Sequence, residues 1–310
     1  MGIGSILLEI FIPVTELLLP IIPGETFPYF FGKQINGNPV EIFQRSLFAT
    51  IIITFTACLL GPFLMMRNLS LIGDGLAHVS FGGVAIGLVV GAADPLWYAL
   101  SFSILAAILI YELQSREILT GDASIAIFLT GFLALGLVVL QIWGGGITSD
   151  IHGYLFGNIL LVSEKNLEMI TIICLISLVS ILPLQKGLLA SSIDPLAARV
   201  QGIPIWHVGL LFSIVTAAVV VSMVKVVGAL LVTALLVTPA ATGRLVGHSY
   251  RSCMIWTQFF GFSSVLIGLY LSSEMDTGNG AMIALVAAIV FAIVGILKTT
   301  INLIIIKNDN

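Results

Sequence analysis

Charged residues are scarce in this sequence. Only 9% of the 310 residues are charged, whereas 58% are hydrophobic and the mean hydropathy is +1.14. A soluble globular domain carries roughly 25% charged residues, so this composition is not that of a protein that folds in water. Its net charge of −4 is small and scattered, which excludes a basic face for nucleic acid. We therefore expect an integral membrane protein in contact with the lipid bilayer.

Cysteine is also scarce, and the signatures of several enzyme classes are absent. The three cysteines, Cys58, Cys174 and Cys253, lie far apart in apolar segments without a CxxC pair, which favours a structural role over a metal or redox role. The sequence has no GxxxxGK[ST] phosphate loop and no HExxH zinc motif. Binding of ATP through such a loop is excluded, and an intramembrane hydrolase is disfavoured. We expect no permanently bound cofactor and no enzymatic activity.

Long apolar stretches take up most of the chain. A membrane-crossing helix needs about 20 apolar residues. Nine stretches qualify, and we expect spans at 44–66, 74–92, 95–113, 124–143, 166–183, 207–225, 227–246, 253–272 and 281–305. The sequence thus predicts an all-α polytopic bundle of about 8–10 spans in the cell membrane, with a transmembrane domain over residues 41–306. Residues 1–40 are expected to form an N-terminal extension that contains an interfacial or short extra helix.

Lysine and arginine are distributed unevenly between the two sets of connections. With nine crossings, eight of them fall on one side and four on the other. Cytoplasmic loops carry the excess, so the segment 184–203 is predicted to be cytoplasmic. Within it, Asp194 can cap a helix that starts at Pro195, and Gly202 can take the left-handed turn that ends it. This short helix is either a plain connector or a docking site for a cytoplasmic partner.

The second predicted span carries an ionisable pair. Asp74 and His78 are four residues apart and therefore share one face of a helix. Ionisable groups at membrane depth are costly and mark functional sites, and a carboxylate with an imidazole suits zinc, manganese or iron. The alternative is that Asp74 caps the helix while His78 bonds to a backbone carbonyl. Gly83, Gly87 and Gly91 follow as a small-residue ridge, which predicts close approach of a neighbouring helix.

A proline interrupts the predicted span 227–246. Pro239 removes one backbone hydrogen bond and crowds the preceding turn, so we expect a kink. Thr233, Thr238 and Thr242 lie close to it. Their hydroxyls can satisfy freed carbonyls or line a polar path, although packing alone would also explain them.

Two predicted external connections contain further polar residues. Asp150 and His152 lie between the fourth and fifth spans, and Glu274 and Asp276 lie between the eighth and ninth. These four side chains could collect a metal ion at an external mouth or contact a delivery protein. Ordinary solvated loop charges are the alternative explanation.

Four motifs together resemble a known family. They read RNLSLIGDGLAHVSFGGVAIG, GYLFGNIL, DPLAARVQGIP and VVGALLVTALLVTPAATGRL. In order and spacing, across about residues 43–300, they resemble the permease subunits of ABC importers for zinc, manganese and iron. The resemblance implies a complex of two permease copies, here a homodimer, with two cytoplasmic ABC ATPase subunits and an extracytoplasmic metal-binding protein.

The same resemblance implies roles for individual residues. The Asp and His that line the family's metal path correspond to Asp74 and His78. The family's ATPase-docking segment corresponds to four residues, namely Asp194, Pro195, Ala198 and Gly202. The family's last external turn reads like DLPxG, and this chain departs from it with MDTGNG around Asp276.

The expected function is import of a divalent transition metal ion by alternating access, with ATP used by the partner subunit. A permease for metal chelates, such as siderophore or cobalamin complexes, and a proton-coupled secondary metal carrier are the alternatives. A small site around Asp74 and His78 favours a bare ion. One carboxylate and one imidazole do not distinguish zinc from manganese or iron.

Overall fold

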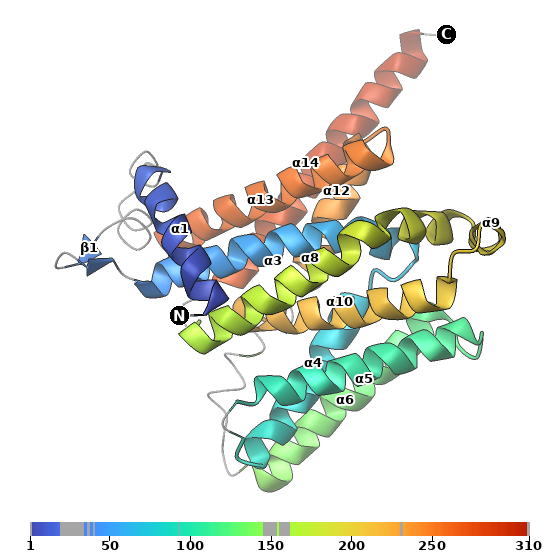
Figure 1. The fold of residues 1–310 in the computed structure, drawn as a ribbon. Helices are drawn as coiled ribbons and strands as arrows, with labels where there is room; N and C mark the ends of the chain where they lie inside the picture. The colour runs from blue at the N-terminus through green and yellow to red at the C-terminus, as the bar shows by residue number, and fades with distance from the viewer. Residues whose placement is uncertain are drawn as a thin grey trace.

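The structure is a computed structural model that describes residues 2–18, 34–35, 38–39, 41–92, 94–144, 154, 162–229 and 232–308. Nearly all of these residues are helical. Two strands of two residues each, β1 (Gln34–Ile35) and β2 (Asn38–Pro39), pair antiparallel beside the helices (Figure 1). The predicted all-α class is confirmed, because this small pair takes no part in the helical bundle.

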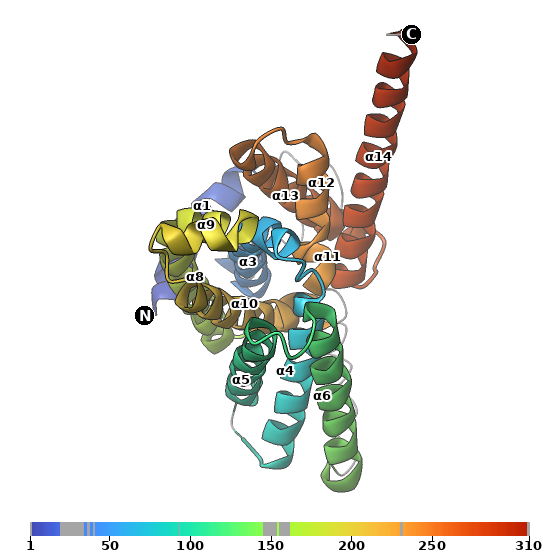
Figure 2. The same ribbon diagram turned by 90° about the vertical axis from the view of Figure 1, so that its right-hand side faces the viewer.

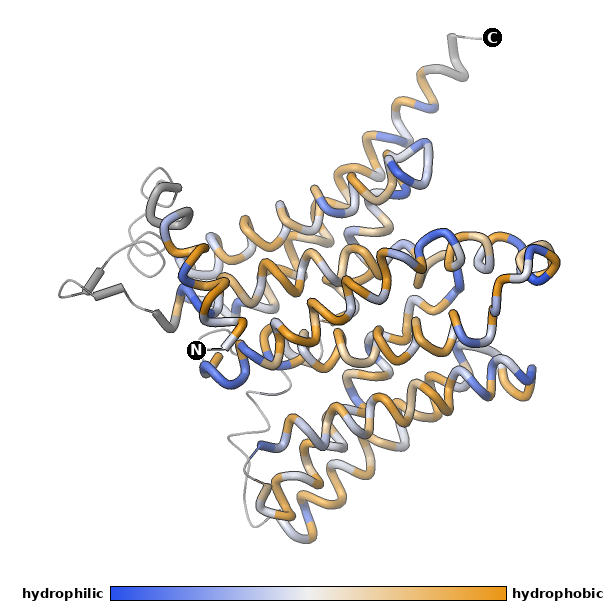
Figure 3. The backbone as a smooth tube through the Cα atoms, in the orientation of Figure 1, coloured by the Kyte–Doolittle hydropathy of each residue, from blue (hydrophilic) through white to orange (hydrophobic). Residues whose placement is uncertain are grey.

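Eight long helices form the body of the molecule. They are α3 (Glu41–Met66), α4 (Ile72–Val89), α5 (Leu96–Ser115), α6 (Gly121–Trp143), α8 (Glu164–Ile193), α10 (Ile205–Val227), α13 (Tyr250–Glu274) and α14 (Asn279–Asn308). Each is long and apolar enough to cross a membrane. Apolar residues run along the helices, and polar residues gather at the two ends of the bundle (Figure 3). The chain is thus a multi-pass membrane protein, as predicted.

Four shorter helices complete the described part of the chain. They are α1 (Ile3–Leu18), α9 (Pro195–Val200), α11 (Val232–Leu236) and α12 (Thr238–Val246). Helix α1 contains Pro13 and packs against α8 and α3. A short additional helix near the N-terminus was predicted. The proposed division into residues 1–40 and 41–306 stays a prediction.

Within the predicted span 227–246, the structure describes two short helices. Helix α11 ends at Leu236, and α12 begins at Thr238 with Pro239 in its first turn. Proline has no N–H to donate, and its ring crowds the carbonyl four residues earlier, here that of Leu235. The helix therefore breaks just before Pro239. The predicted interruption at Pro239 is confirmed.

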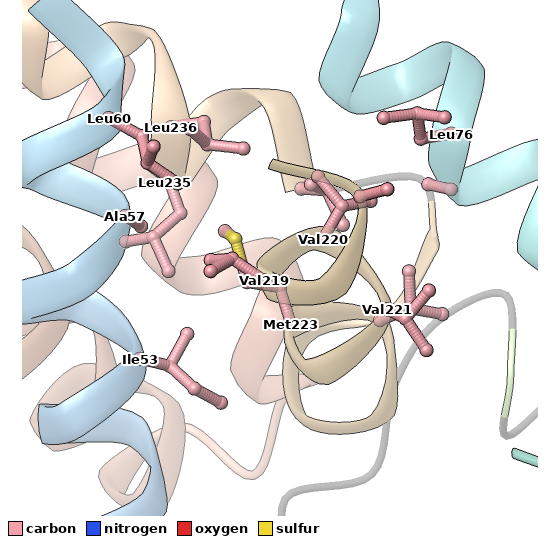
Figure 4. Close-up of a cluster of buried hydrophobic side chains, with 14 of the residues drawn as sticks. Ile53, Ala57, Leu60, Leu76, Val219, Val220, Val221, Met223, Leu235 and Leu236 are labelled. Carbon is pink, nitrogen blue, oxygen red and sulfur yellow. The ribbon is translucent and has the colours of Figure 1, made fainter. Parts of the chain in front are cut away.

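Helices α3 and α10 lie at the centre of the bundle. Helices α4, α5 and α6 pack on one side of them, and α12, α13 and α14 pack on the other (Figures 1 and 2). Figure 4 shows the core where α3, α10, α11 and α4 meet. Its buried side chains include Ile53, Ala57, Leu60, Leu76, Val219, Val220, Val221, Met223, Leu235 and Leu236. This core lies directly beside the turn of α4 that carries Asp74 and His78.

Glycines bring α4 against α5 at backbone distance. A Cβ at Gly83 would lie 2.8 Å from the Cα of Ala99, and one at Gly87 would lie 3.1 Å from the Cα of Pro95. The predicted ridge is confirmed for these two glycines. Gly91 was assigned to the ridge wrongly. It has a φ of +74° and ends α4, because a left-handed residue closes a helix at little cost when it is glycine.

Connections predicted to share one side of the membrane meet at one end of the bundle. The Arg67 Nη2 group donates to Ser191 Oγ at 2.8 Å, and Trp206 Nε1 donates to Glu112 Oε2 at 3.2 Å. These contacts join the ends of α3, α5 and α8 and the start of α10, next to α9. These connections therefore lie at the same end of the bundle, as predicted, and their cytoplasmic location stays a prediction.

Candidate functional site

Asp74 and His78 lie on the first two turns of α4. The His78 Nε2 atom is 3.7 Å from Asp74 Oδ1, which is close enough for an ion pair but longer than a hydrogen bond. The His78 side chain is 9% exposed and the Asp74 side chain is 35% exposed. The carboxylate therefore reaches the surface of the single chain, and the imidazole lies beneath it.

Neither Asp74 nor His78 caps the start of α4. Leu71 stands at the cap position without a side-chain capping bond, and Gly75 N donates to Leu71 O at 3.0 Å. The Nδ1 atom of His78 is buried without a hydrogen-bond partner. Leaving a buried polar group unpaired costs about 1–3 kcal/mol. The alternative explanation, a capping carboxylate with a carbonyl-bonded imidazole, therefore does not describe this site.

Thr233 adds another unpaired polar group at the same level. Its hydroxyl is buried without a partner. A Cβ at Gly73 of α4 would lie 3.6 Å from Thr233 Oγ1 and 3.2 Å from Leu236 Cδ1, so α11 packs directly against the first turn of α4. The Thr242 hydroxyl, by contrast, donates to the carbonyl of Thr238 at 2.8 Å. Thr233 thus keeps a hydroxyl that can line a polar path, whereas the hydroxyl of Thr242 is already used.

One chain offers too few ligands here for tight metal binding. Among the described residues, no group of three or more His, Cys, Asp and Glu side chains could hold a metal ion. Structural zinc sites use four protein ligands, whereas this chain brings one carboxylate, one imidazole and a nearby hydroxyl. The cysteines do not add to the site, because Cys58, Cys174 and Cys253 are free thiols on α3, α8 and α13.

The short helix α9 forms as the sequence predicts. Asp194 Oδ1 accepts hydrogen bonds from the N–H groups of Leu196 at 2.9 Å and Ala197 at 3.0 Å. Pro195 occupies the first helical position. Gly202 has a φ of +79°, which places it in the left-handed region just after the helix. Both ends of a six-residue helix are thereby fixed.

One of the four residues expected to dock the ATPase on α9 is buried, and two other residues are exposed instead. Ala198 is 1% exposed and faces the bundle, so it anchors α9 to the rest of the chain. Leu196 and Val200 are 74% and 89% exposed. Sequence reasoning missed these two residues, although apolar side chains four apart on a capped loop helix were a usable signal.

In the part of the chain that it describes, the structure does not bring the polar residues expected at an external mouth together with Asp74 and His78. Glu274 ends α13, and Asp276 follows in the turn to α14 with a φ of +51°. The Ser272 hydroxyl closes this turn by donating to Thr277 O at 2.6 Å. Asp150 and His152 lie outside the residues that the structure describes.

Comparison with known proteins finds similarity along most of the chain. Residues 39–298 match the ABC 3 transport family. The chain is 31% identical over 250 residues to the manganese transport system membrane protein MntC of Listeria monocytogenes, which covers 81% of this chain and 88% of that protein. It is 29% identical over 253 residues to the high-affinity zinc uptake system membrane protein ZnuB of Haemophilus influenzae, covering 82% and 96%. The solved structure of PsaBC from Streptococcus pneumoniae in complex with Fab aligns at 31% identity with a TM-score of 0.72, covering 82% of this chain and 90% of that one.

Proposed function

This chain belongs to the ABC 3 transport family, and on that premise we propose that it is the membrane-spanning permease subunit of an ATP-driven importer for a divalent transition metal ion. It is a transport subunit and not an enzyme. The observation that carries the proposal is the pair of Asp74 and His78 on α4, where a buried imidazole nitrogen lacks a partner within the chain. Carboxylate and imidazole together suit manganese, zinc and iron.

Manganese and zinc are the first ions to test. A manganese system and a zinc system are both among the relatives, and iron is the third candidate by ligand chemistry. The names of these relatives refer to metal ions and not to chelates. A carboxylate next to an imidazole also fits a bare ion better than a bulky siderophore or cobalamin complex.

The transport site needs a second copy of the chain. Each copy contributes Asp74 and His78, so a two-fold symmetric pair of copies offers four ligands to one ion. The partial exposure of the Asp74 carboxylate on the single chain supports this arrangement. Movement of the copies relative to each other would then dismantle the site and release the ion. A site whose ligands come from two chains that can separate binds the ion weakly enough to release it, which suits transport better than a closed cage of ligands.

Two further partners complete the importer. Because the sequence has no phosphate loop, ATP hydrolysis belongs to a cytoplasmic ABC ATPase. Helix α9 is its docking element, with Leu196 and Val200 presented on a frame fixed by Asp194. An extracytoplasmic metal-binding protein delivers the ion to the opposite end of the bundle.

Metal uptake by the reconstituted complex tests the proposal. In proteoliposomes with the ATPase and the binding protein, Asp74→Asn and His78→Gln should each lower uptake of manganese or zinc about tenfold or more, since even the loss of an outer-shell partner of a metal site costs 10–100-fold. Asp122→Asn is the matched control for the first variant, because Asp122 also lies in the first turn of a long helix. His207→Gln, outside this site, is the control for the second.

Two results would contradict the proposal. Undiminished uptake by both variants would reject the site. Uptake that continues after ATP is depleted, with the ion gradients clamped, would instead favour the proton-coupled carrier.

A further inference from the structure

Arg67 joins the end of α3 to the end of α8. Its Nε group donates to Ser192 Oγ at 3.1 Å, and its Nη2 group donates to Ser191 Oγ at 2.8 Å. Ile193 alone separates these serines from Asp194, the cap of α9. The guanidinium group is therefore bonded to the segment that leads into α9.

The same side chain also contacts the helix that follows α9. The guanidinium carbon of Arg67 lies 5.2 Å from the centroid of the Phe212 ring on α10, within the range of a cation–π contact. Arg67 thus touches the helices on both sides of α9. A displacement of α9 that moved α8 and α10 would act on this one side chain from two directions.

A tight turn connects Arg67 to the candidate metal site. Asn68 has a φ of +56°, and Leu69 N donates to Leu64 O at 2.8 Å. Ile72 N then donates to Leu69 O at 3.1 Å, which starts α4 directly. The turn is hydrogen-bonded to both helices and therefore links Arg67 to the first turns of α4, where Asp74 and His78 lie.

The partners of Arg67 are unusual for a half-buried cation. In the described part of the chain no carboxylate lies within salt-bridge distance of it, and its partners are two hydroxyls and an aromatic ring. Burial lowers the pKa of Arg67 from its ordinary value. A guanidinium offers its donors in a fixed planar geometry, which suits two neighbouring hydroxyls and a ring better than the flexible point charge of a lysine.

We infer that Arg67 is a positioning residue that transmits the ATP-driven movement of α9 to the turn of α4 that holds the ion. The inference rests on the proposed function. It predicts that the loss of Arg67 uncouples the two activities of the complex: ATP hydrolysis continues, whereas release of the ion no longer follows it.

The ratio of ions moved to ATP hydrolysed measures this coupling. In the complete complex in proteoliposomes, with manganese and zinc as the probes, Arg67→Gln should lower the ratio about tenfold or more, the size expected for losing hydrogen bonds to a charged group. The double variant Ser191→Ala/Ser192→Ala should lower it as well, because it removes the same two acceptors and keeps the arginine. Arg67→Lys should restore part of the ratio, since it keeps the charge but not the bidentate geometry.

Arg116→Gln is the matched control. Arg116 is an arginine at the end of α5 whose side chain is 67% exposed and paired with Glu112, so the ratio should stay at the wild-type value.

A wild-type ratio in Arg67→Gln and in the serine double variant would overturn the inference. Equal losses of hydrolysis and uptake would overturn it too, because they indicate a merely structural role. If Arg67→Gln does not fold, the serine variant decides. Absent metal uptake by the wild-type complex would instead overturn the proposed function.

Discussion

Unpaired polar groups are the most informative single-residue feature of this chain. Buried polar atoms in native proteins nearly always have a partner, so each exception needs an explanation. Other hydroxyls on the same helices are satisfied locally, as where Ser80 Oγ donates to Ala77 O at 2.6 Å. His78 Nδ1 and Thr233 Oγ1 have no partner, and their helices pack against each other. Both atoms could therefore bind a passing cation, as the proposed function requires.

The Thr233 hydroxyl can be removed with almost no change of shape. We expect Thr233→Val to leave the stability of the protein unchanged or slightly higher, because no hydrogen bond is lost. Metal uptake at low ion concentration should fall several-fold if the hydroxyl is a ligand. Uptake as a function of metal concentration, together with the Tm in detergent, checks both expectations.

Thr242→Val is the control for this prediction. It removes the hydroxyl that donates to Thr238 O, so stability should fall by about 1 kcal/mol while uptake per folded protein is kept. A Thr233→Val variant with the uptake curve of the wild type would remove Thr233 from the proposed path.

At the scale of elements, the break between α11 and α12 depends on how closely α3 approaches it. A Cβ at Gly61 of α3 would lie 2.9 Å from the Cβ of Ala240 and closer still to the carbonyl oxygen of Leu236. The end of α11 is thus in direct contact with the backbone of α3. Pro239 interrupts the helix, and the absence of a side chain at Gly61 leaves space for the end of α11 and the start of α12.

A methyl group at position 61 should disturb this packing. We expect Gly61→Ala to lower the free energy of unfolding by about 1–3 kcal/mol, the usual cost of overpacking a core. Gly131→Ala on α6 is the matched control, since nothing lies within 4 Å of its added Cβ. The Gly131→Ala variant should be as stable as the wild type or slightly more stable, because alanine favours helix more than glycine does.

Thermal unfolding of the two variants in detergent measures the difference. The prediction concerns the packing of α3 on α11 and does not depend on the transported ion. Equal Tm values for Gly61→Ala and Gly131→Ala would show that α3 and α11 are less closely packed than described.

At the scale of the whole molecule, helices α6, α4, α11 and α14 form one continuous row (Figure 2). The two outer members, α6 and α14, are the least buried of the long helices. The partly exposed Asp74 carboxylate belongs to an inner member of this row. A second copy of the chain placed over this row would bring two sets of ligands together, as the proposed transport site requires.

A covalently fused pair of chains tests whether the copies share one ion. If the ligands of both copies hold the same ion, a fusion with Asp74→Asn and His78→Gln in only one half should lose nearly all metal uptake. Two independent sites would leave about half of the uptake. Uptake by the fused complex in proteoliposomes separates these outcomes, and a fusion with Asp122→Asn in one half is the control.

The sequence by itself determined the features that depend on near neighbours in the chain. Hydropathy located the eight long helices, because each span must satisfy its own backbone in lipid. The cap at Asp194 and the left-handed Gly202 followed from local hydrogen-bonding chemistry. The pair of Asp74 and His78 was visible because four residues separate neighbours on a helix face.

Only the tertiary structure decided what depends on which helices pack together. It showed that Ala198 faces inward, that Thr233 lies beside Gly73, and that Arg67 bonds to residues more than 120 positions away. Lipid is as apolar as the helices, so hydropathy gives little preference among helix pairs, and close packing of particular side chains selects the arrangement. That selection is a property of the folded chain, which is why no local pattern contained it.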